Sequence, residues 1–429
     1  MRAWIDDGRW DLTVCPEGRA VRQTTGERVT TLPAPAVRPV AINLTSMWRN
    51  PSHPDRPLHA IVQPPGPALF AAIRDALAGD GPAVLPLVPG HEGPAIEALR
   101  PTHVGGVPRD DGAGVPDDVA VVISTSGSTG APKGVLLSAA ALRASATASL
   151  RRVGAVKGER WLCCLPVAHV SGLQVLVRAL LSGSEPVIHP SFDPPTRCWA
   201  PAPTTSPWSP PSSTGWSRWG ADLSAFRSIV LGGAAPRPGL LDRARELGAR
   251  VVTTYGSSET SGGCVYDGRP LDGVDLKIGE DGLIRIAGPV LFSGYRFDRP
   301  PAPLDGGWFV TSDLGELDGG RLRVLGRADD VINTGGEKVV AAAVTAVLAA
   351  HPEVADAAVI GVPDPEWGEL VTAVIVPADP GAPPTLSQLR AFCRDRLPPH
   401  AAPRDLRLMS RLPLLPNGKT DLVRLRAGT

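Results

Sequence analysis

The sequence lacks an excess of either charge and any long apolar run, and these absences exclude several classes of protein. Its 429 residues carry 43 basic and 43 acidic side chains, which give a formal charge of zero. A neutral chain has no broad electrostatic attraction for nucleic acid or an anionic membrane, so we expect small-molecule partners. No apolar run reaches the roughly 18 residues of a membrane span, and the opening MRAWIDDGRWD lacks the apolar region of a secretion signal. We therefore predict a cytoplasmic protein without membrane insertion, of unknown oligomeric state.

The six cysteines are scattered along the chain and never form a CxxC pair. This spacing indicates neither a zinc site nor a disulfide framework. We expect reduced thiols in structural positions.

Lysine is scarce although arginine is common, with five lysines among the 43 basic residues. Each of the five lysines is therefore a candidate for a functional role. Two of them, Lys133 and Lys419, lie in the glycine-containing stretches TSGSTGAPKG (125–134) and LPNGKTD (415–421).

Apolar patterns of helix and strand alternate from residue 67 onward. The run VAVVIS (119–124) is typical of a buried strand, Ser138 would cap a helix ending near Val153, and WLCCLP (161–166) predicts another strand. Such alternation predicts mostly parallel sheets flanked by helices, with ligands at the carboxyl ends of the strands.

The pattern of predicted helices and strands changes twice in the later part of the chain. Beyond about residue 265, short strands predict a small β-rich subdomain with a hairpin around EDG (280–282). A second helix-and-strand pattern from EKVV (337–340) predicts a smaller α+β domain. We divide the chain into a weakly structured extension or misplaced start (1–50), an N-terminal domain (51–326) and a C-terminal domain (327–429).

The stretch TSGSTGAPKG does not match the Walker A loop, because Lys133 follows a proline and precedes a glycine. Gly127 and Gly130 would let the backbone approach a ligand closely. Hydroxyls and amides of Ser126, Ser128 and Thr129 would suit phosphate oxygens. The alternative is a flexible Gly/Ser turn, but such linkers rarely follow a buried strand directly.

Seven stretches, taken in order, resemble motifs of the adenylate-forming superfamily, which includes acyl-CoA synthetases, luciferases and adenylation domains. The resemblance implies that a carboxylic acid attacks the α-phosphate of ATP and that a thiol then intercepts the acyl-adenylate. The domain 327–429 would be mobile between these steps. The seven are TSGSTGAPKG (125–134), LPVAHVSG (165–172), LGGAAP (231–236), YGSSET (255–260), TSDLG (311–315), GRADDVINTGGEKV (326–339) and LPNGKTD (415–421).

The resemblance also implies roles for individual residues in binding ATP and Mg²⁺. Lys419 would stabilise the transferring phosphoryl group, and Glu259, helped by Thr129, would hold Mg²⁺. Asp313 and Arg327 would reach the ribose. Thr125, Ser126, Gly127, Ser128, Gly130 and Lys133 would bind the phosphates, and Gly233, Ala234, Ala235 and Tyr255 would frame the adenine. The remaining ATP-binding residues would be Gly256, Ser258 and Thr260.

Further residues would serve the acid and coenzyme A. His169 matches a position beside the acyl pocket, although a lone histidine is more often structural. Asp329 matches the hinge of the mobile domain. Gly335 and Gly336 would approach the pantetheine of coenzyme A.

The acid itself is suggested by two longer phrases, LPVAHVSGLQVLVRALLSG (165–183) and YGSSETSGGCVYDGRPLDGV (255–274). They resemble a compact group of this superfamily, the o-succinylbenzoate–CoA ligases of menaquinone synthesis. Alternatives are another aryl- or acyl-CoA ligase, a stand-alone adenylation enzyme, and a homologue with weakened or no activity.

Residues 196–219 interrupt the pattern where another strand and helix should lie. They hold four of the ten tryptophans and many prolines without a convincing period. A loop of this length inside a domain is uncommon. Because a shifted reading frame of plausible codons yields VPTQLDRLVAL, we hypothesise a pair of compensating frameshifts here.

Overall fold

The computed structural model describes residues 55–428, except 127–131, 190–203, 209–222, 224–225, 235, 237–238, 300–301 and 415–419. The predicted extension 1–50 lies outside these residues. No helix in the described part of the chain is long and apolar enough to span a membrane.

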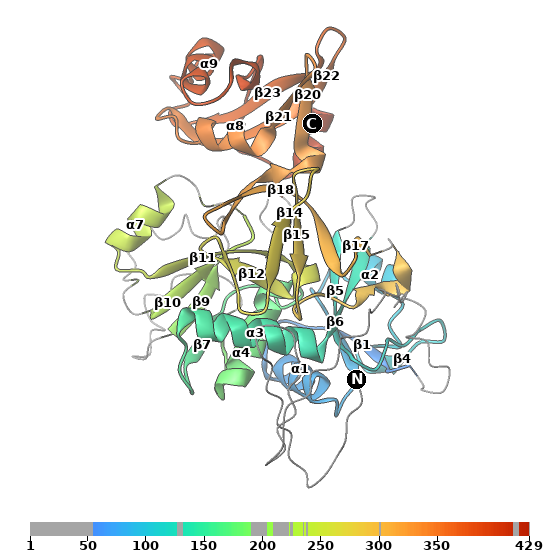
Figure 1. The fold of residues 1–429 in the computed structure, drawn as a ribbon. Helices are drawn as coiled ribbons and strands as arrows, with labels where there is room; N and C mark the ends of the chain where they lie inside the picture. The colour runs from blue at the N-terminus through green and yellow to red at the C-terminus, as the bar shows by residue number, and fades with distance from the viewer. Residues whose placement is uncertain are drawn as a thin grey trace, which may run out of the picture. The chain divides into compact units, whose positions relative to one another are not determined.

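The first sheet has the strand order β16-β6-β5-β2-β1-β3-β4 (Figure 1). Its central strands are parallel, and its outer strands pair antiparallel. The predicted strand 119–124 is confirmed as part of β5. The elements are β1 (Leu58–Val62), α1 (Pro67–Ala78), β2 (Ala83–Leu87), α2 (Gly93–Leu99), β3 (His103–Val104), β4 (Val107–Pro108), β5 (Val119–Ser126), β6 (Pro132–Ser138) and β16 (Gly294–Tyr295).

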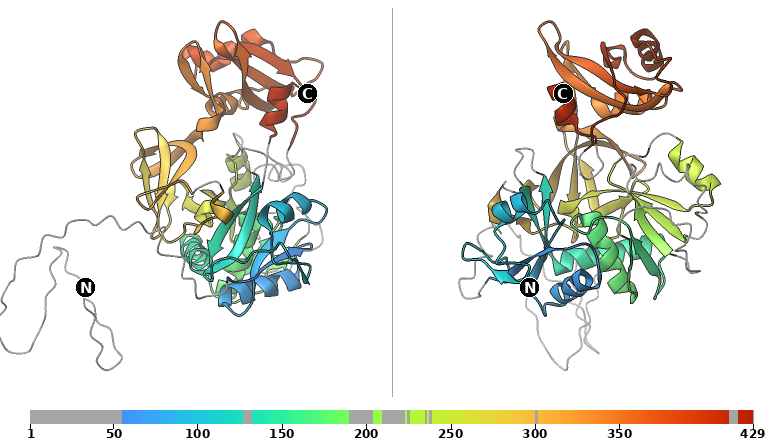
Figure 2. Two further views of the ribbon diagram at one scale, coloured as in Figure 1. Left: turned by 90° about the vertical axis from the view of Figure 1, so that its right-hand side faces the viewer. Right: turned by 180° about the vertical axis from the view of Figure 1, so that it is seen from behind.

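The second sheet has the order β13-β12-β11-β10-β9-β7-β8 and is parallel from β8 to β11. Helices α3 and α4 pack on each other and share one buried core with strands of both sheets (Figure 1, Figure 2). The elements are α3 (Ala139–Val153), β7 (Arg160–Cys163), α4 (Val170–Ser182), β8 (Val187–Ile188), β9 (Thr204–Trp208), β10 (Ser228–Leu231), α7 (Leu240–Glu246), β11 (Val251–Ser257), β12 (Gly262–Tyr266) and β13 (Arg269–Pro270).

Helix α3 begins and ends where the sequence predicts. The Ser138 hydroxyl accepts a hydrogen bond from the amide of Ala141 at 3.1 Å, which satisfies one unpaired N–H of the first turn. Gly154, at φ 70°, ends the helix in the left-handed region that glycine adopts without strain.

Part of the interrupted segment 196–219 is a strand. Residues Thr204–Trp208 form β9, which lies between β7 and β10 and runs parallel to both. The expectation that the whole segment breaks the strand pattern was therefore wrong for these five residues. The local sequence TTSPW shows no alternation, so the sheet context overrides a weak local signal. The frameshift hypothesis remains a prediction.

A small β-rich subdomain follows, with the strand order β14-β15-β18-β17 and β19 paired to β18. The predicted hairpin around EDG (280–282) is confirmed, because β14 and β15 pair antiparallel with Lys277 opposite Arg285. The strands are β14 (Asp275–Ile278), β15 (Leu283–Ala287), β17 (Leu304–Asp305), β18 (Trp308–Asp318) and β19 (Arg321–Arg327).

The C-terminal sheet has helices on both faces. Alternate residues of β22 point to opposite sides: Ala357 and Val359 pack with α8 and α9, and Ala358 and Ile360 pack with α10. The fold class, a large N-terminal α/β domain and a smaller C-terminal α+β domain, is thus confirmed. The proposed boundary after residue 326 stays a prediction. The elements are β20 (Val331–Thr334), β21 (Glu337–Val340), α8 (Ala341–Leu348), β22 (Val354–Asp364), β23 (Gly368–Pro377), α9 (Leu386–Arg394), β24 (Asp405–Leu408) and α10 (Leu422–Ala427).

Four cysteines lie in the described part of the chain. Cys163, Cys164, Cys264 and Cys393 are buried, and none of these four forms a disulfide. Burial raises the pKa of the Cys163 and Cys264 thiols to about 12. These two thiols are therefore uncharged at neutral pH, in keeping with structural positions.

Candidate active site

Three segments far apart in the sequence bring together Lys133, Glu259 and Tyr295. The Lys133 ammonium lies 3.3 Å from Glu259 Oε1 and 3.2 Å from the Tyr295 hydroxyl. The Tyr295 hydroxyl donates a hydrogen bond of 2.8 Å to the same Glu259 oxygen. We refer to Lys133, Glu259 and Tyr295 as the buried triad.

The turn after β11 holds Glu259 in place. Glu259 lies in a short 3₁₀ helix, Ser258–Thr260, which ends at Ser261 with φ 52°. This left-handed conformation is strained for a residue other than glycine, and surrounding bonds must stabilise it. The Ser261 carbonyl accepts hydrogen bonds from Ser145 of α3 at 3.1 Å and Gln174 of α4 at 2.7 Å. Two core helices thus fix the turn that carries Glu259.

Burial and neighbours act in opposite directions on the pKa of Glu259. Burial, the largest influence, favours the neutral acid, but the hydrogen bond from Tyr295, the charge of Lys133 and further hydrogen bonds together outweigh it, so the pKa is lowered. Burial and the charge of Glu259 raise the pKa of Tyr295. The carboxylate is therefore ionised while the phenol keeps its proton.

A second group of similar composition consists of Tyr255, Asp313 and Arg327, here called the open triad. The Tyr255 hydroxyl donates to Asp313 Oδ2 at 2.7 Å, and Arg327 Nη1 lies 3.7 Å from Asp313 Oδ1. Asp313 and Arg327 are direct partners on β18 and β19. Arg327 also donates to Asp329 at 3.0 Å.

The segment YGSSET (255–260) joins the two triads, since it supplies Tyr255 to one and Glu259 to the other. Between them, Gly256 lies at a β-bulge where β11 pairs with β12. A Cβ at Gly256 would overlap the carbonyl oxygen of Gly262. Close strand approach therefore explains this glycine without any ligand. Ser258 and Thr260 belong to the same turn, where the Thr260 hydroxyl accepts from the amide of Ser257 at 2.8 Å.

The buried triad has the donor set that Mg²⁺ prefers when it is shared with a nucleotide. Mg²⁺ usually takes one or two protein carboxylates together with phosphates and waters. Glu259 supplies one ionised, buried carboxylate, and the residues that the structure describes contain no group of three metal-ligating side chains. A site of this kind fits Mg²⁺ held with phosphate better than an ion enclosed by protein alone.

Lys133 and Thr125 face each other across strands rather than in a loop. Lys133 lies on β6 and pairs with Thr125 on β5, so the lysine is part of the sheet. The β5–β6 pairing fixes the backbone of Lys133, and its role at the phosphates stays a prediction. Ser126 ends β5.

Other predicted residues lie at loop and helix ends. His169 is the residue before α4 and is half-buried, and its amide donates to the Pro166 carbonyl at 3.1 Å. Gly233 and Ala234 are exposed directly after β10. Asp329 is exposed in the short 3₁₀ helix Ala328–Asp330, which follows β19.

Gly335 and Gly336 form the turn between β20 and β21. Both have positive φ angles, 59° and 83°, which a two-residue hairpin turn requires. A Cβ at Gly335 would lie 2.8 Å from the Trp367 ring. Turn geometry thus accounts for both glycines independently of a coenzyme.

Six predicted site residues lie outside the described part of the chain, and their roles stay predictions. They are Gly127, Ser128, Thr129, Gly130, Ala235 and Lys419.

Sequence reasoning missed Tyr295. The chain has only three tyrosines, and the scarcity argument applied to lysine would have marked this one in FSGYRF (292–297).

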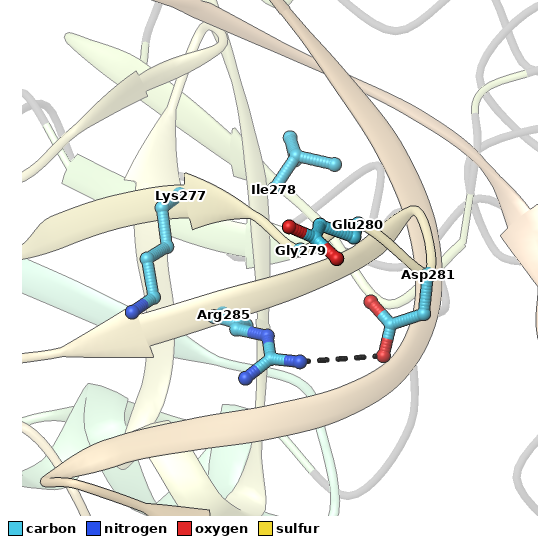
Figure 3. Close-up of a pocket in the computed structure, with 6 residues that line it drawn as sticks. All are labelled: Lys277, Ile278, Gly279, Glu280, Asp281 and Arg285. Carbon is cyan, nitrogen blue, oxygen red and sulfur yellow. Dashed lines mark hydrogen bonds and ion pairs between the residues drawn. The ribbon is translucent and has the colours of Figure 1, made fainter.

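A pocket of about 510 Å³ lies at the turn of the β14–β15 hairpin, and no member of either triad lines it (Figure 3). Lys277 and Arg285 line it together with Glu280 and Asp281. Arg285 pairs with Asp281 at 3.3 Å and Asp305 at 2.6 Å, and the Lys277 ammonium lies 4.2 Å from the Trp308 ring centre. These contacts hold the hairpin turn and join the hairpin to β17 and β18. No predicted site residue lines the pocket.

Comparison with known proteins agrees with the motif pattern. Residues 76–296 match the family described as AMP-binding enzyme, and residues 343–419 match its C-terminal domain. The chain belongs to the AMP-binding enzyme family. The resemblance seen in the seven motifs is thereby confirmed.

Several members of the AMP-binding enzyme family are similar along most of the chain. A probable 2-succinylbenzoate–CoA ligase of Mycobacterium tuberculosis is 41% identical over 399 residues, which cover 86% of this chain and 99% of the relative. The o-succinylbenzoate coenzyme A synthetase of Bacillus subtilis, solved with ATP and a magnesium ion, has a TM-score of 0.73 at 26% identity and covers 88% and 90%. An amide bond synthetase of Marinactinospora thermotolerans has a TM-score of 0.77 at 28% identity, with the same coverage.

Proposed function

We propose that this AMP-binding enzyme is an ATP-dependent o-succinylbenzoate–CoA ligase. It would form an acyl-adenylate from the acid and ATP, release pyrophosphate, and transfer the acyl group to coenzyme A. The reaction type is supported by the buried triad, which places an ionised carboxylate beside a lysine. The choice of acid is supported by the Mycobacterium tuberculosis relative, which is 41% identical and aligns over 99% of its length.

In the first half-reaction, the chain must hold strongly charged phosphates in line with the attacking acid. Glu259, with Thr129, would hold Mg²⁺, which neutralises phosphate charge when bound. Lys133 would leave Glu259 to bind the outer phosphates, assisted by residues 125–130. Lys419 would stabilise charge on the transferring group, and His169 would border the acid.

The nucleoside would lie along the open triad. Asp313 would accept hydrogen bonds from the ribose hydroxyls, with Arg327 beside it. Tyr255, Gly256, Ser258 and Thr260 would border the base from one strand and turn. Residues 233–235 would border it from the loop after β10.

For the second half-reaction, the domain 327–429 would rotate about Asp329 and bring Gly335 and Gly336 to the pantetheine. The exposed position of Asp329 in the single turn after β19 supports a hinge there. We place the reaction in the cytoplasm, where ATP and coenzyme A are supplied.

A second candidate function is another acyl transfer from an adenylate, with a different acid or with an amine as acceptor. The structural comparison favours it. The amide bond synthetase has a TM-score of 0.77, which is higher than the 0.73 of the Bacillus subtilis ligase. Such an enzyme would share the first half-reaction and differ only in the acceptor.

Pyrophosphate release over a panel of aromatic and aliphatic acids, with and without coenzyme A, tests the proposal. We expect release with o-succinylbenzoate and a thioester product only when coenzyme A is present. Pyrophosphate release with another acid but not with o-succinylbenzoate would refute the proposed substrate. Adenylate formation without any thioester would favour the second candidate. No release from any acid would indicate an inactive homologue, as a damaged segment 196–219 would produce.

A further inference from the structure

Each of the three tyrosines uses its hydroxyl to join distant parts of the chain. Tyr255 bonds Asp313, Tyr266 bonds Ser149 at 2.7 Å, and Tyr295 bonds Glu259. Only Tyr295 lies between two opposite charges. We propose that Tyr295 is a positioning residue: it fixes the direction of the Glu259 carboxylate for Mg²⁺ and holds Lys133 beside it until phosphate arrives. This inference rests on the proposed function.

The hydroxyl of Tyr295 forms hydrogen bonds with both charged groups of the buried triad at once. It donates to Glu259 Oε1 at 2.8 Å and accepts from the Lys133 ammonium at 3.2 Å. Lys133 also contacts Oε1, so both bonds to Glu259 engage the same oxygen and restrain rotation of the carboxylate. The Lys133 ammonium lies 4.6 Å from the Tyr295 ring centre, which adds a cation–π attraction.

Tyr295 itself is anchored by contacts that need no ligand. Its backbone pairs with Val135 on β6, two residues from Lys133, and its ring meets the Phe292 ring edge-on at 5.0 Å. The next residue, Arg296, is buried and donates hydrogen bonds to the carbonyls of four residues. These are Leu99, Arg100, Ala113 and Gly114.

The anchoring makes Tyr295 the fixed member of the buried triad. Lysine has a long flexible stem, so phosphate can draw Lys133 away, whereas the ring of Tyr295 cannot follow. The bond from Tyr295 then remains to hold Glu259 when the lysine leaves. Without the hydroxyl, a buried carboxylate would keep Lys133 as its one triad partner and would bind metal less readily.

The test is Tyr295→Phe in the full chain, which keeps the ring and removes only the hydroxyl. The measurement is calorimetric binding of α,β-methylene-ATP, a non-reacting analogue, with and without Mg²⁺. Loss of a hydrogen bond to a charged group predicts about a tenfold weaker Kd with Mg²⁺. Without Mg²⁺, we expect the Kd to change by less than about threefold, because the nucleoside contacts are untouched.

The double variant shows whether Tyr295 acts through Glu259. In a Glu259→Gln background, Tyr295→Phe should change the Kd with Mg²⁺ by less than about twofold. An equal tenfold change in both backgrounds, or no change in either, would overturn the positioning role. If Mg²⁺ still lowers the Kd of the Glu259→Gln chain as it does for the unmodified chain, Glu259 does not hold the metal. That result would refute the metal assignment of the proposed function, and the role of Tyr295 would be refuted with it.

Tyr266→Phe is the matched control, because it removes a buried phenol hydroxyl that bonds Ser149 outside the triads. We expect its Kd with Mg²⁺ to stay within about twofold of the unmodified chain even if its melting temperature falls. A tenfold weakening in this control as well would show a general packing effect and would refute the specific role of Tyr295.

Discussion

The two triads have the same composition, a tyrosine, a carboxylate and a cation, but differ in exposure. In the buried triad, the side chains of Glu259 and Lys133 are 10% and 25% exposed, and the ions lie 3.3 Å apart. In the open triad, those of Asp313 and Arg327 are 23% and 53% exposed, and the ions lie 3.7 Å apart. Attraction is stronger and less screened by salt in the buried group. The buried triad therefore suits a fixed charge for metal and phosphate, and the open triad suits exchangeable bonds beside the proposed hinge at Asp329.

The largest effect should come from a cation outside both triads. Lys419→Ala should reduce pyrophosphate release by more than about 100-fold, because the charge on the transferring phosphoryl group loses its partner. Thioester formation from supplied acyl-adenylate should remain. Equal loss of both half-reactions would refute this role.

Glu259→Ala should be nearly as severe, with about a 100-fold loss of pyrophosphate release, since it removes the metal carboxylate and leaves Lys133 unpaired. Initial rates at saturating Mg²⁺ would measure it. The matched control is Glu316→Ala, which removes an exposed carboxylate paired with Arg323 on the neighbouring strand. Comparable losses in both variants would contradict the contrast between buried and exposed charges.

Gly256→Ala should disturb both triads together. The new methyl group would overlap the Gly262 carbonyl, and overpacking of this kind lowers the free energy of unfolding by about 1–3 kcal/mol. Thermal or urea unfolding would measure the change. Gly93→Ala is the control, because no atom lies within 4 Å of its added methyl. A stable Gly256→Ala protein would show that β11 and β12 approach each other less closely than described.

Asp313→Asn should raise the KM for ATP by about tenfold and change kcat less, because it weakens bonds to a ribose that does not react. Steady-state kinetics with ATP varied would test this. A fall in kcat with an unchanged KM would move Asp313 from nucleoside binding to the chemical step.

Arg327→Lys should have the smallest effect, about two- to threefold in KM for ATP, since exposed ion pairs contribute less than about 1 kcal/mol. The difference from the unmodified chain should shrink as salt rises. A salt-independent loss of more than tenfold would show that Arg327 makes a bond that lysine cannot reproduce.

Most residues of the candidate site could be selected from the sequence because they lie in compact motifs, and their roles stay predictions. Glu259, Asp313 and Lys133 each stand in a short stretch whose order along the chain carries the family pattern. What the sequence could not show is which residues meet across 126 or 162 positions, as Lys133 does with Glu259 and with Tyr295. Such contacts depend on how β6, β16 and the turn after β11 are paired.

The misses have similar causes. Strand β9 has no local alternation and exists because two neighbouring strands pair with it. Tyr295 was missed because it lies in none of the seven motifs, and its contact with Lys133 depends on the pairing of β16 with β6. The role of Gly335 and Gly336 toward coenzyme A stays a prediction, and their positive φ angles satisfy a hairpin turn.

We infer that the two triads divide metal binding from nucleoside binding. Titration of Mg²⁺ against α,β-methylene-ATP binding, in Glu259→Gln and Asp313→Asn chains side by side, tests it directly. We expect Glu259→Gln to abolish the gain in affinity that Mg²⁺ gives, and Asp313→Asn to weaken binding equally with and without Mg²⁺. Equal loss of the Mg²⁺ gain in both variants would contradict the division.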